Sequence, residues 1–139
     1  MATITKEAII KAPPEAVWAA VRDVGRIHLN LCPGFVTDTR MDGEDRIVTF
    51  GNGLVLRERI ISLDDERRRL AWNAVSERLT HHNGVMEVFD DELEDCTRII
   101  WTADLLPHDI APTVEAMMDA GVAAMKATLE RRAQISKGA

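Results

Sequence analysis

Glu58 and His82 are the residues of this sequence best suited, by type and by neighbours, to acid–base chemistry or ligand recognition. In the run Leu54 to Leu63, period-two alternation puts Arg57 and Arg59 on one face and Glu58 on the other, among apolar residues. Burying an unpaired charge is costly, so a carboxylate there must find a partner, hold water or have a raised pKa. The alternative is a β-bulge that turns Glu58 outward into a surface ion pair with an arginine.

His82 belongs to a second run, Thr80 to Phe89, in which it shares a face with Gly84 and Met86 while His81 lies on the opposite face. An inward imidazole near a carboxylate could serve as general base, as a hydrogen-bonding group for a ligand, or as a pH switch. A histidine among apolar residues is equally often a satisfied core residue. The two histidines lack the neighbouring carboxylates of a metal site, so we expect no metal.

The apolar candidates for a pocket are flat or flexible side chains. Leu56 shares the Glu58 face of its strand, and the indole of Trp72 can either pack as core or stack on a flat ligand. Met118, Gly121 and Met125 recur on one face of the C-terminal segment, although core packing explains the methionines about equally well. Glycine costs ~1 kcal/mol relative to alanine inside a helix, so Gly121 indicates either room for a ligand or a close backbone approach.

Prolines and glycines mark the first elements that must position these residues. Thr3 to Lys11 is rich in isoleucine and threonine and predicts a strand, which Pro13-Pro14 ends. The same prolines favour the first turn of a helix, and apolar residues continue at helical spacing until Gly25. A second short helix is predicted over Ile27 to Leu31.

The remainder of the chain predicts a β-meander followed by one long helix. From Pro33-Gly34 to Leu106, about six strands alternate with polar turns. These turns are Asp42 to Asp45, Gly51 to Gly53, Asp64 to Glu66, Val75 to Glu77 and Asp90 to Asp95. Pro112 can then open a helix that continues to about Ala133, with a frayed tail from Ser136 to Ala139.

The fold class follows from what must cover the sheet. An antiparallel sheet of this length buries one face, and the C-terminal helix is the element long and apolar enough to cover it. We therefore predict an α+β helix-grip fold over residues 1–139 as a single domain. It has a curved antiparallel sheet of about seven strands, two short helices after the first strand, and a long C-terminal helix.

Composition and missing motifs exclude several classes of function. Seventeen basic against 23 acidic residues give a net charge of -6, so we expect neither nucleic acid nor anionic membrane surfaces as partners. No signal sequence or apolar stretch of membrane-spanning length is present, which predicts a cytoplasmic protein without membrane insertion. Cys32 and Cys96 form no Cys-x-x-Cys pair and are expected to be reduced thiols. Nucleophile elbows, nucleotide-binding loops and zinc motifs are missing from the sequence, so we expect no cofactor.

Three stretches give the chain a family resemblance. Ile10 to Trp18, with the sequence IKAPPEAVW, resembles the opening strand and Pro-capped helix of the START and birch-pollen-allergen superfamily, also called SRPBCC. Arg57 to Leu70 is similar to a hairpin of plant abscisic-acid receptors and their bacterial relatives, and Ile99 to Thr102 resembles the last strand. The polyketide cyclase/dehydrase-like branch of this superfamily is the most similar. The resemblance implies an internal cavity for lipids, hormones, polyketides or aromatic metabolites.

The resemblance also suggests further site residues. The glutamate that matches Glu58 lines the hormone cavity in the plant receptors. Asn30 falls where those receptors carry a cavity lysine, so the principal cation is absent and a neutral or weakly polar ligand is expected. Aligning Trp101 with the receptors turns Asp104 inward, whereas the count of apolar residues turns Trp101 itself inward. Asp104 is therefore kept as a ligand-binding candidate.

Two functions, and one further class of function, are consistent with these observations. The first is binding or transport of a small hydrophobic ligand, such as a lipid, polyketide or aromatic metabolite, in an internal cavity. The alternative is a cofactor-free polyketide cyclase or dehydratase in which Glu58 and His82 transfer protons. A partner-binding module is the third class, and a homodimer stays open.

Overall fold

The computed structural model describes residues 2–138, and its seven strands form one antiparallel sheet in the order β1-β7-β6-β5-β4-β3-β2. The strands are β1 (Ala2–Ile10), β2 (Val36–Asp42), β3 (Asp45–Phe50), β4 (Val55–Asp64), β5 (Arg69–Val75), β6 (His81–Asp90) and β7 (Thr97–Leu106). The helices are α1 (Pro14–Arg22), α2 (Ile27–Asn30), the short 3₁₀ turn η1 (His108–Ile110) and α3 (Ala111–Gly138). The predicted helix-grip architecture is confirmed.

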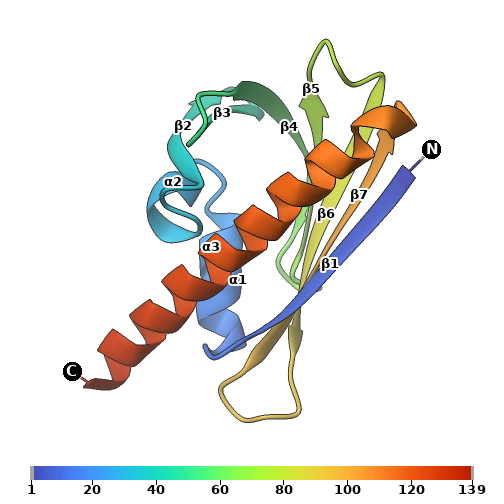
Figure 1. The fold of residues 1–139 in the computed structure, drawn as a ribbon. Coiled ribbons are helices and arrows are strands. Elements are labelled where there is room, and N and C mark those ends of the chain that lie inside the picture. Colours follow the sequence, from blue (N-terminus) through green and yellow to red (C-terminus); the bar gives the residue numbers. More distant parts are fainter. Residues whose placement is uncertain (1, 139) are drawn as a thin grey trace.

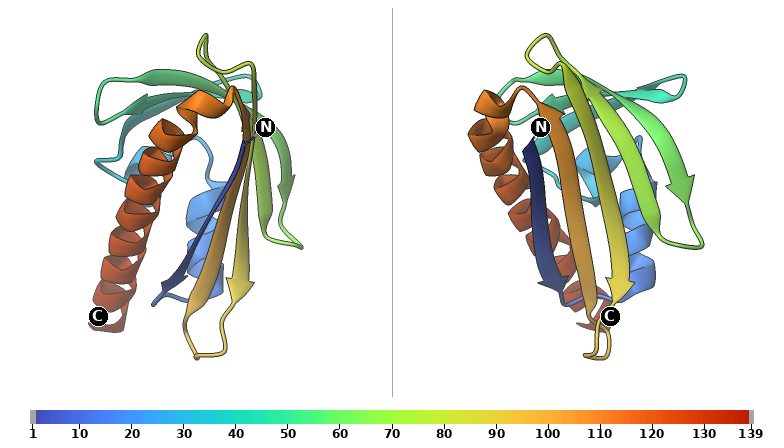
Figure 2. Two further views of the ribbon diagram at one scale, coloured as in Figure 1. Left: turned by 45° about the vertical axis from the view of Figure 1, so that its right-hand side comes forward. Right: turned by 90° about the vertical axis from the view of Figure 1, so that its right-hand side faces the viewer.

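The sheet curls around α3, which crosses its concave side (Figure 1). In the side views, β2 and β3 bend over towards the first turns of α3, while β1, β7 and β6 stand upright beside it (Figure 2). All five predicted turns join successive strands. Gly43 and Gly53 have φ values of +64° and +90° in two of these turns, a backbone region that glycine enters without steric cost.

Polar contacts hold α3 against the edge strand β1. Lys6 on β1 forms ion pairs with Asp119 at 3.0 Å and with Glu115 at 3.5 Å. About two turns beyond Asp119 on α3, Lys126 donates a hydrogen bond to the carbonyl oxygen of Ile9 at 2.6 Å. These contacts leave the opposite, apolar face of the helix turned to the interior of the sheet.

The long helix differs from its predicted bounds at both ends. It begins at Ala111, one residue before Pro112, and continues through Gly138 rather than stopping near Ala133. The prediction of a frayed tail is therefore wrong for residues 136–138, and Ala139 lies outside the described residues. The predicted stripe is confirmed at Met118, Gly121 and Met125, which are buried, and the buried Leu129 continues it.

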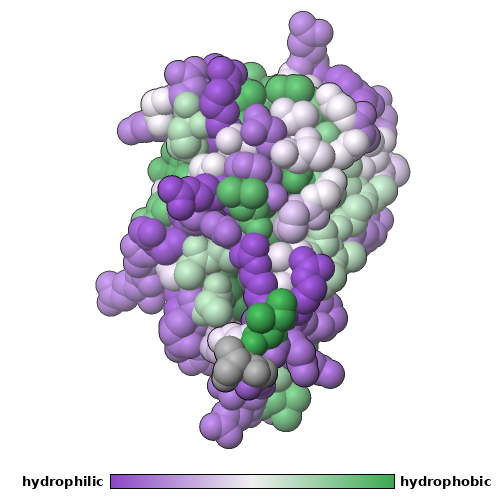
Figure 3. Space-filling model, turned by 90° about the vertical axis from the view of Figure 1, so that its left-hand side faces the viewer, coloured by the Kyte–Doolittle hydropathy of each residue, from purple (hydrophilic) through white to green (hydrophobic). Residues whose placement is uncertain are grey.

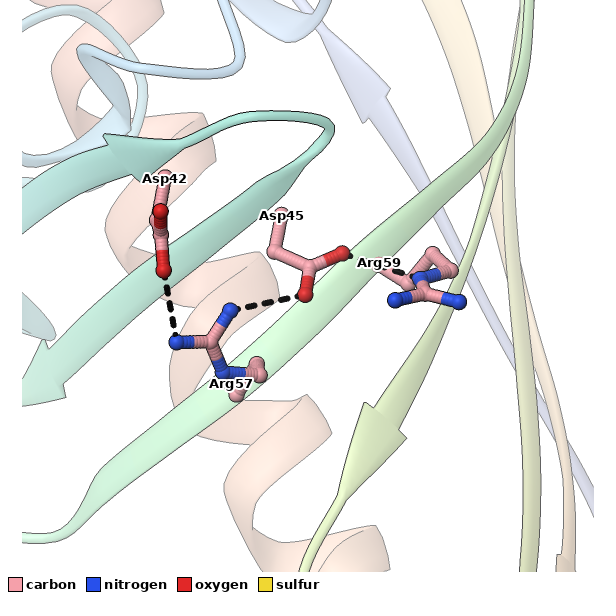
Figure 4. Close-up of polar contacts among 4 residues, drawn as sticks. All are labelled: Asp42, Asp45, Arg57 and Arg59. Carbon is pink, nitrogen blue, oxygen red and sulfur yellow. Dashed lines mark hydrogen bonds and ion pairs between the residues drawn. The ribbon is translucent and has the colours of Figure 1, made fainter.

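The outer face of the sheet carries a chain of alternating charges where β3 and β4 meet (Figure 4). Arg59 Nε donates to Asp45 Oδ1 at 3.0 Å, and Arg57 Nη1 donates to Asp45 Oδ2 at 2.8 Å. Arg57 Nη2 reaches on to Asp42 Oδ2 at 2.8 Å. Hydrogen bonds from Arg59 and then Arg57 hold the pKa of the Asp45 carboxyl below its usual range. Both arginines thus face outward, as the alternation in β4 predicts.

Replacing Asp45 by asparagine tests this cluster. We expect Asp45→Asn to lower the free energy of unfolding at neutral pH and to flatten its decline in acid. The reason is that a carboxyl with a depressed folded pKa stabilises the protein above its unfolded pKa of ~3.9, and this is lost as the pH falls through the folded value. Urea unfolding between pH 2 and pH 7 measures both effects. Asp38→Asn, at an exposed position of β2, is the control and should change neither.

Candidate functional site

A cavity of about 110 Å³ lies between α3 and the concave face of the sheet. An engineered cavity of ~150 Å³ binds benzene, whereas pockets for drug-sized ligands begin near ~300 Å³. Six of the predicted ligand-binding residues line it: Leu56, Glu58, Trp72, His82, Met118 and Met125. The predicted inward faces of β4, β5 and β6 therefore converge on one cavity.

Methionines and aromatic rings make up much of the wall. Met86 joins Met117, Met118 and Met125 around the cavity, and these side chains can change rotamer at little cost. Trp72 and Trp101 lie side by side with ring centroids 6.1 Å apart. The wall is thus apolar and adaptable, apart from a small number of polar groups.

Glu58 is paired inside the cavity with an arginine that the sequence analysis did not select. Arg46 and Glu58 are direct cross-strand neighbours on β3 and β4, and Arg46 Nε donates to Glu58 Oε1 at 2.8 Å. Both residues are buried, at 4% and 8% exposure. The surface ion pair considered as the alternative for Glu58 does not form. Arg46 alternates in phase with the buried Val48 and Phe50, and this pattern was the signal that could have found it.

The ion pair leaves hydrogen-bonding capacity on its cavity side. Arg46 Nη1 donates to the carbonyl oxygen of Val24 at 3.4 Å, and the guanidinium lies 5.5 Å from the centroid of the Trp72 ring. Within residues 2–138, neither Arg46 Nη2 nor Glu58 Oε2 makes a hydrogen bond. The pair is neutral as a whole, yet it keeps a donor group and an acceptor that no other described residue uses.

His82 is held in one tautomer by the backbone of the neighbouring strand. The Ala74 amide donates to His82 Nδ1 at 2.9 Å, so the proton of the neutral ring is on Nε2. Burial lowers the pKa of His82 to about 4; the nearby His81 lowers it further, while Asp104 opposes the shift. His82 is therefore neutral at physiological pH, and its ring, which lines the cavity, carries a hydrogen-bond donor at Nε2.

Cys32 adds a protonated thiol to the wall. Burial raises its pKa to about 12; Arg46 opposes that shift and Glu58 adds to it. The thiolate is the reactive form, so this cysteine is chemically inert, in keeping with the structural role expected for it. Among the described residues there is no cluster of side chains that could hold a metal ion.

Three predicted site residues lie outside the wall of this cavity. Asn30 donates to Asp23 at 2.9 Å, and it lines a separate hollow between α1 and α3. Asp104 faces the outer side of the sheet, where Thr3 Oγ1 donates to it at 2.6 Å. Gly121 has no free space over it, as described next.

Close packing accounts for the missing side chain at Gly121. A Cβ there would lie 2.9 Å from the ring of Trp101 and 3.0 Å from that of Phe35. Of the two interpretations of this glycine, the structure supports close approach, here of two aromatic rings. The same contact shows that Trp101 faces inward on β7, which settles the ambiguity of that strand against Asp104.

The cavity adjoins an open apolar groove between α3 and the β3–β4 hairpin. Phe35, Phe50 and Met117 line both spaces and so form the partition between them. The two phenylalanine rings meet edge to face with centroids 5.4 Å apart. The face of the molecule shown in Figure 3 mixes hydrophobic areas with hydrophilic ones.

Comparisons with known proteins agree with the fold. A family profile described as "Polyketide cyclase / dehydrase and lipid transport" matches residues 1–130. No curated protein matches the sequence. No helix among residues 2–138 is long and apolar enough to cross a membrane.

Three solved structures illustrate the range of similar folds. An uncharacterized protein from Bacillus thuringiensis has a TM-score of 0.82 at 15% identity, over 92% of this chain and 98% of its own. A norcoclaurine synthase point mutant from Thalictrum flavum, in complex with a transition-state analogue, has a TM-score of 0.72 at 20% identity, over 98% and 96%. A START superfamily protein from Mycobacterium smegmatis has a TM-score of 0.71 at 11% identity, over 95% and 97%. At these identities the likeness shows the fold.

Removing one partner of the buried ion pair should destabilise the protein strongly. We expect Arg46→Met to cost about 3–5 kcal/mol of unfolding free energy, because Glu58 is left buried and uncompensated. The double variant Arg46→Met/Glu58→Leu should recover most of that loss. Chemical denaturation measures both, and Arg98→Met at the exposed Arg98–Glu7 pair should cost below about 1 kcal/mol. Equal losses at the two arginines would contradict the assignment.

The neutral state of His82 predicts a specific loss of stability in mild acid. The pKa of His82 is ~6.5 in the unfolded chain and about 4 in the folded protein. The stabilisation from the neutral imidazole is therefore complete above the unfolded pKa and is lost as the pH falls towards the folded pKa. The contribution of His82 to this decline approaches about 3 kcal/mol. His82→Gln keeps an acceptor for the Ala74 amide and should flatten the slope, whereas His81→Gln removes only a secondary cause of the lowered His82 pKa and should flatten it less. Urea unfolding between pH 4 and pH 8 makes the comparison, and identical slopes in wild type and His82→Gln would refute it.

Proposed function

Because the chain belongs to the polyketide cyclase/dehydrase and lipid transport family, we propose that it binds a small, mostly apolar molecule in the cavity under α3. The family and its START-superfamily neighbours support hydrophobic-ligand binding in general. The observation that carries the proposal for this chain is an apolar cavity of about 110 Å³ whose wall includes the Arg46–Glu58 pair and His82. Convergence of a few polar groups on an apolar pocket is typical of small-molecule sites.

The size of the cavity limits the class of ligand. A volume of about 110 Å³ suits a single ring or a short branched chain rather than a complete lipid. Rotamer changes of Met117, Met118 and Met125 would enlarge it along α3. We therefore propose a monocyclic or bicyclic ligand, with larger molecules accommodated through the methionines.

The polar groups determine which chemical groups such a ligand should carry. His82 Nε2–H and Arg46 Nη2 offer donors, and Glu58 Oε2 offers an acceptor. A ligand with one carbonyl or hydroxyl group complements them, while its remaining surface contacts apolar wall. A free carboxylic acid is less suitable, because the charge of Arg46 is already balanced by Glu58. This agrees with the neutral or weakly polar ligand expected from the sequence.

The same hydrogen bonds favour binding over acid–base catalysis. A general base needs a free lone pair, and the Nδ1 lone pair of His82 is occupied by the Ala74 amide. Glu58 Oε1 is likewise occupied by Arg46. A cyclase or dehydratase that used His82 as its base would have to break the contact with Ala74, and the free Glu58 oxygen, Oε2, belongs to a carboxylate that is already paired with Arg46, so proton transfer by these residues has the weaker support.

The apolar groove beside the cavity provides the access route in this proposal. Rotation of Phe35 and Met117 would join the groove to the interior without breaking a strand pairing. Gly51 donates its amide hydrogen bond to the Phe35 carbonyl at 2.9 Å, which keeps the backbone of the two loops together while the side chains move.

Filling the cavity from the helix should abolish binding. Val114 lines the cavity on α3, so we expect Val114→Phe to weaken the binding of monocyclic and bicyclic aromatic ketones and phenols at least about tenfold, since the ring takes the space of the ligand. Ala123→Phe, at an exposed position of the same helix, should bind as wild type does. A panel screened by thermal shift and followed by calorimetric titration gives the affinities. Equal affinity in both variants would place the ligand elsewhere and overturn the proposal.

A further inference from the structure

A polar hollow lies on the outer face of the sheet, separate from the spaces described above. It is beside the β5–β6 hairpin, which projects at the top of Figure 1. Its lining includes His81, Asn83 and Asp104. Ala74, Leu79 and His82 line both this hollow and the internal cavity, so they form the partition between the two. The cavity therefore has two partitions: the apolar one at Phe35, which separates it from the groove, and this one, which contains the imidazole of His82.

The sheet is open at this partition because β5 and β6 separate there. Their pairing ends at Trp72 and Gly84, although β5 stays paired with β4 as far as Val75 and β6 stays paired with β7 as far as His81. The Ala74 amide, which a strand neighbour would otherwise engage, donates to His82 Nδ1. A side chain has taken the place of a backbone hydrogen bond in the sheet.

Local packing shows that the gap is closed by side chains alone. A Cβ at Gly84 would lie 2.8 Å from the ring of Trp72 and 3.2 Å from His82 Cε1, so the indole and the imidazole lie together over this glycine. On the outer side, Asn73 Oδ1 is buried and has no hydrogen-bond partner within residues 2–138. An unsatisfied carbonyl oxygen beside the partition is a ready acceptor for water.

We propose that His82 is the movable seal of a second opening of the cavity, through which water passes between the interior and the outer face. When the Ala74–His82 hydrogen bond breaks and the imidazole rotates, polar groups line the passage from the cavity to the hollow. Water leaving an apolar cavity then has a polar exit that is separate from the groove beside Phe35. The inference concerns water alone and stands whether or not the proposed ligand binds.

Fluorine NMR of 5-fluorotryptophan-labelled protein tests the seal without any ligand. The chain has three tryptophans, and Trp72, whose ring lies with that of His82 over Gly84, is assigned by Trp72→Phe. The H₂O/D₂O isotope shift of each resonance reports its contact with water. We expect the Trp72 shift in His82→Ala to rise from a small wild-type value towards that of free fluorotryptophan, while Trp18 stays unchanged. His81→Ala, the matched control on the outer face, should resemble wild type.

Two results would overturn the proposal. One is a Trp72 isotope shift that is the same in His82→Ala as in wild type. The other is an equal rise in His81→Ala, which would mean general loosening of the hairpin.

Amide hydrogen exchange of the wild-type protein provides a second test that needs no variant. If the seal opens locally, the Ala74 amide should show at least about tenfold lower protection than the amides in the paired part of β5. Exchange of Ala74 only through global unfolding, with the same protection as its paired neighbours, would show that the seal stays closed and would refute the inference.

Discussion

The position of α3 across a curved sheet is the constraint on which the rest of this structure depends. The helix is attached along one side to the edge strand β1, through Lys6 of the strand and Lys126 of the helix. Its apolar face then spans the concave surface. The distance between helix and sheet is set by bulky contacts such as Phe35 and Trp101 against Gly121. Between these supports the side chains do not fill the space completely, and a cavity remains.

The charged and imidazole groups in that cavity each have a partner within the sheet, whereas the buried Trp101 Nε1 has none among residues 2–138. Arg46 neutralises Glu58 across one strand pair, and the Ala74 amide fixes the imidazole of His82. Such partners reduce the cost of burial while leaving one donor or acceptor of each group unused. In the function that we propose, these unused donors and acceptors orient a ligand through hydrogen bonds.

The fold and several wall residues could be predicted from local patterns. Period-two alternation placed Glu58 and His82 inward and Arg57 and Arg59 outward, since side-chain direction in a strand depends only on neighbours along the chain. Arg46 obeys the same rule, and it escaped notice because charged residues are seldom expected inside. Asn30 and Asp104 were suggested by alignment with relatives, which does not determine where a side chain points.

The sequence by itself determined the order of elements, the covering role of the C-terminal helix and the inward faces of the strands, because these follow from periodicity and turn chemistry. Only the tertiary structure decided that Glu58 meets Arg46, that Gly121 makes room for aromatic rings, and that β5 and β6 part at Trp72. Strand register, sheet curvature and the volume left by packing depend on contacts between residues far apart in the chain, and no local pattern encodes them.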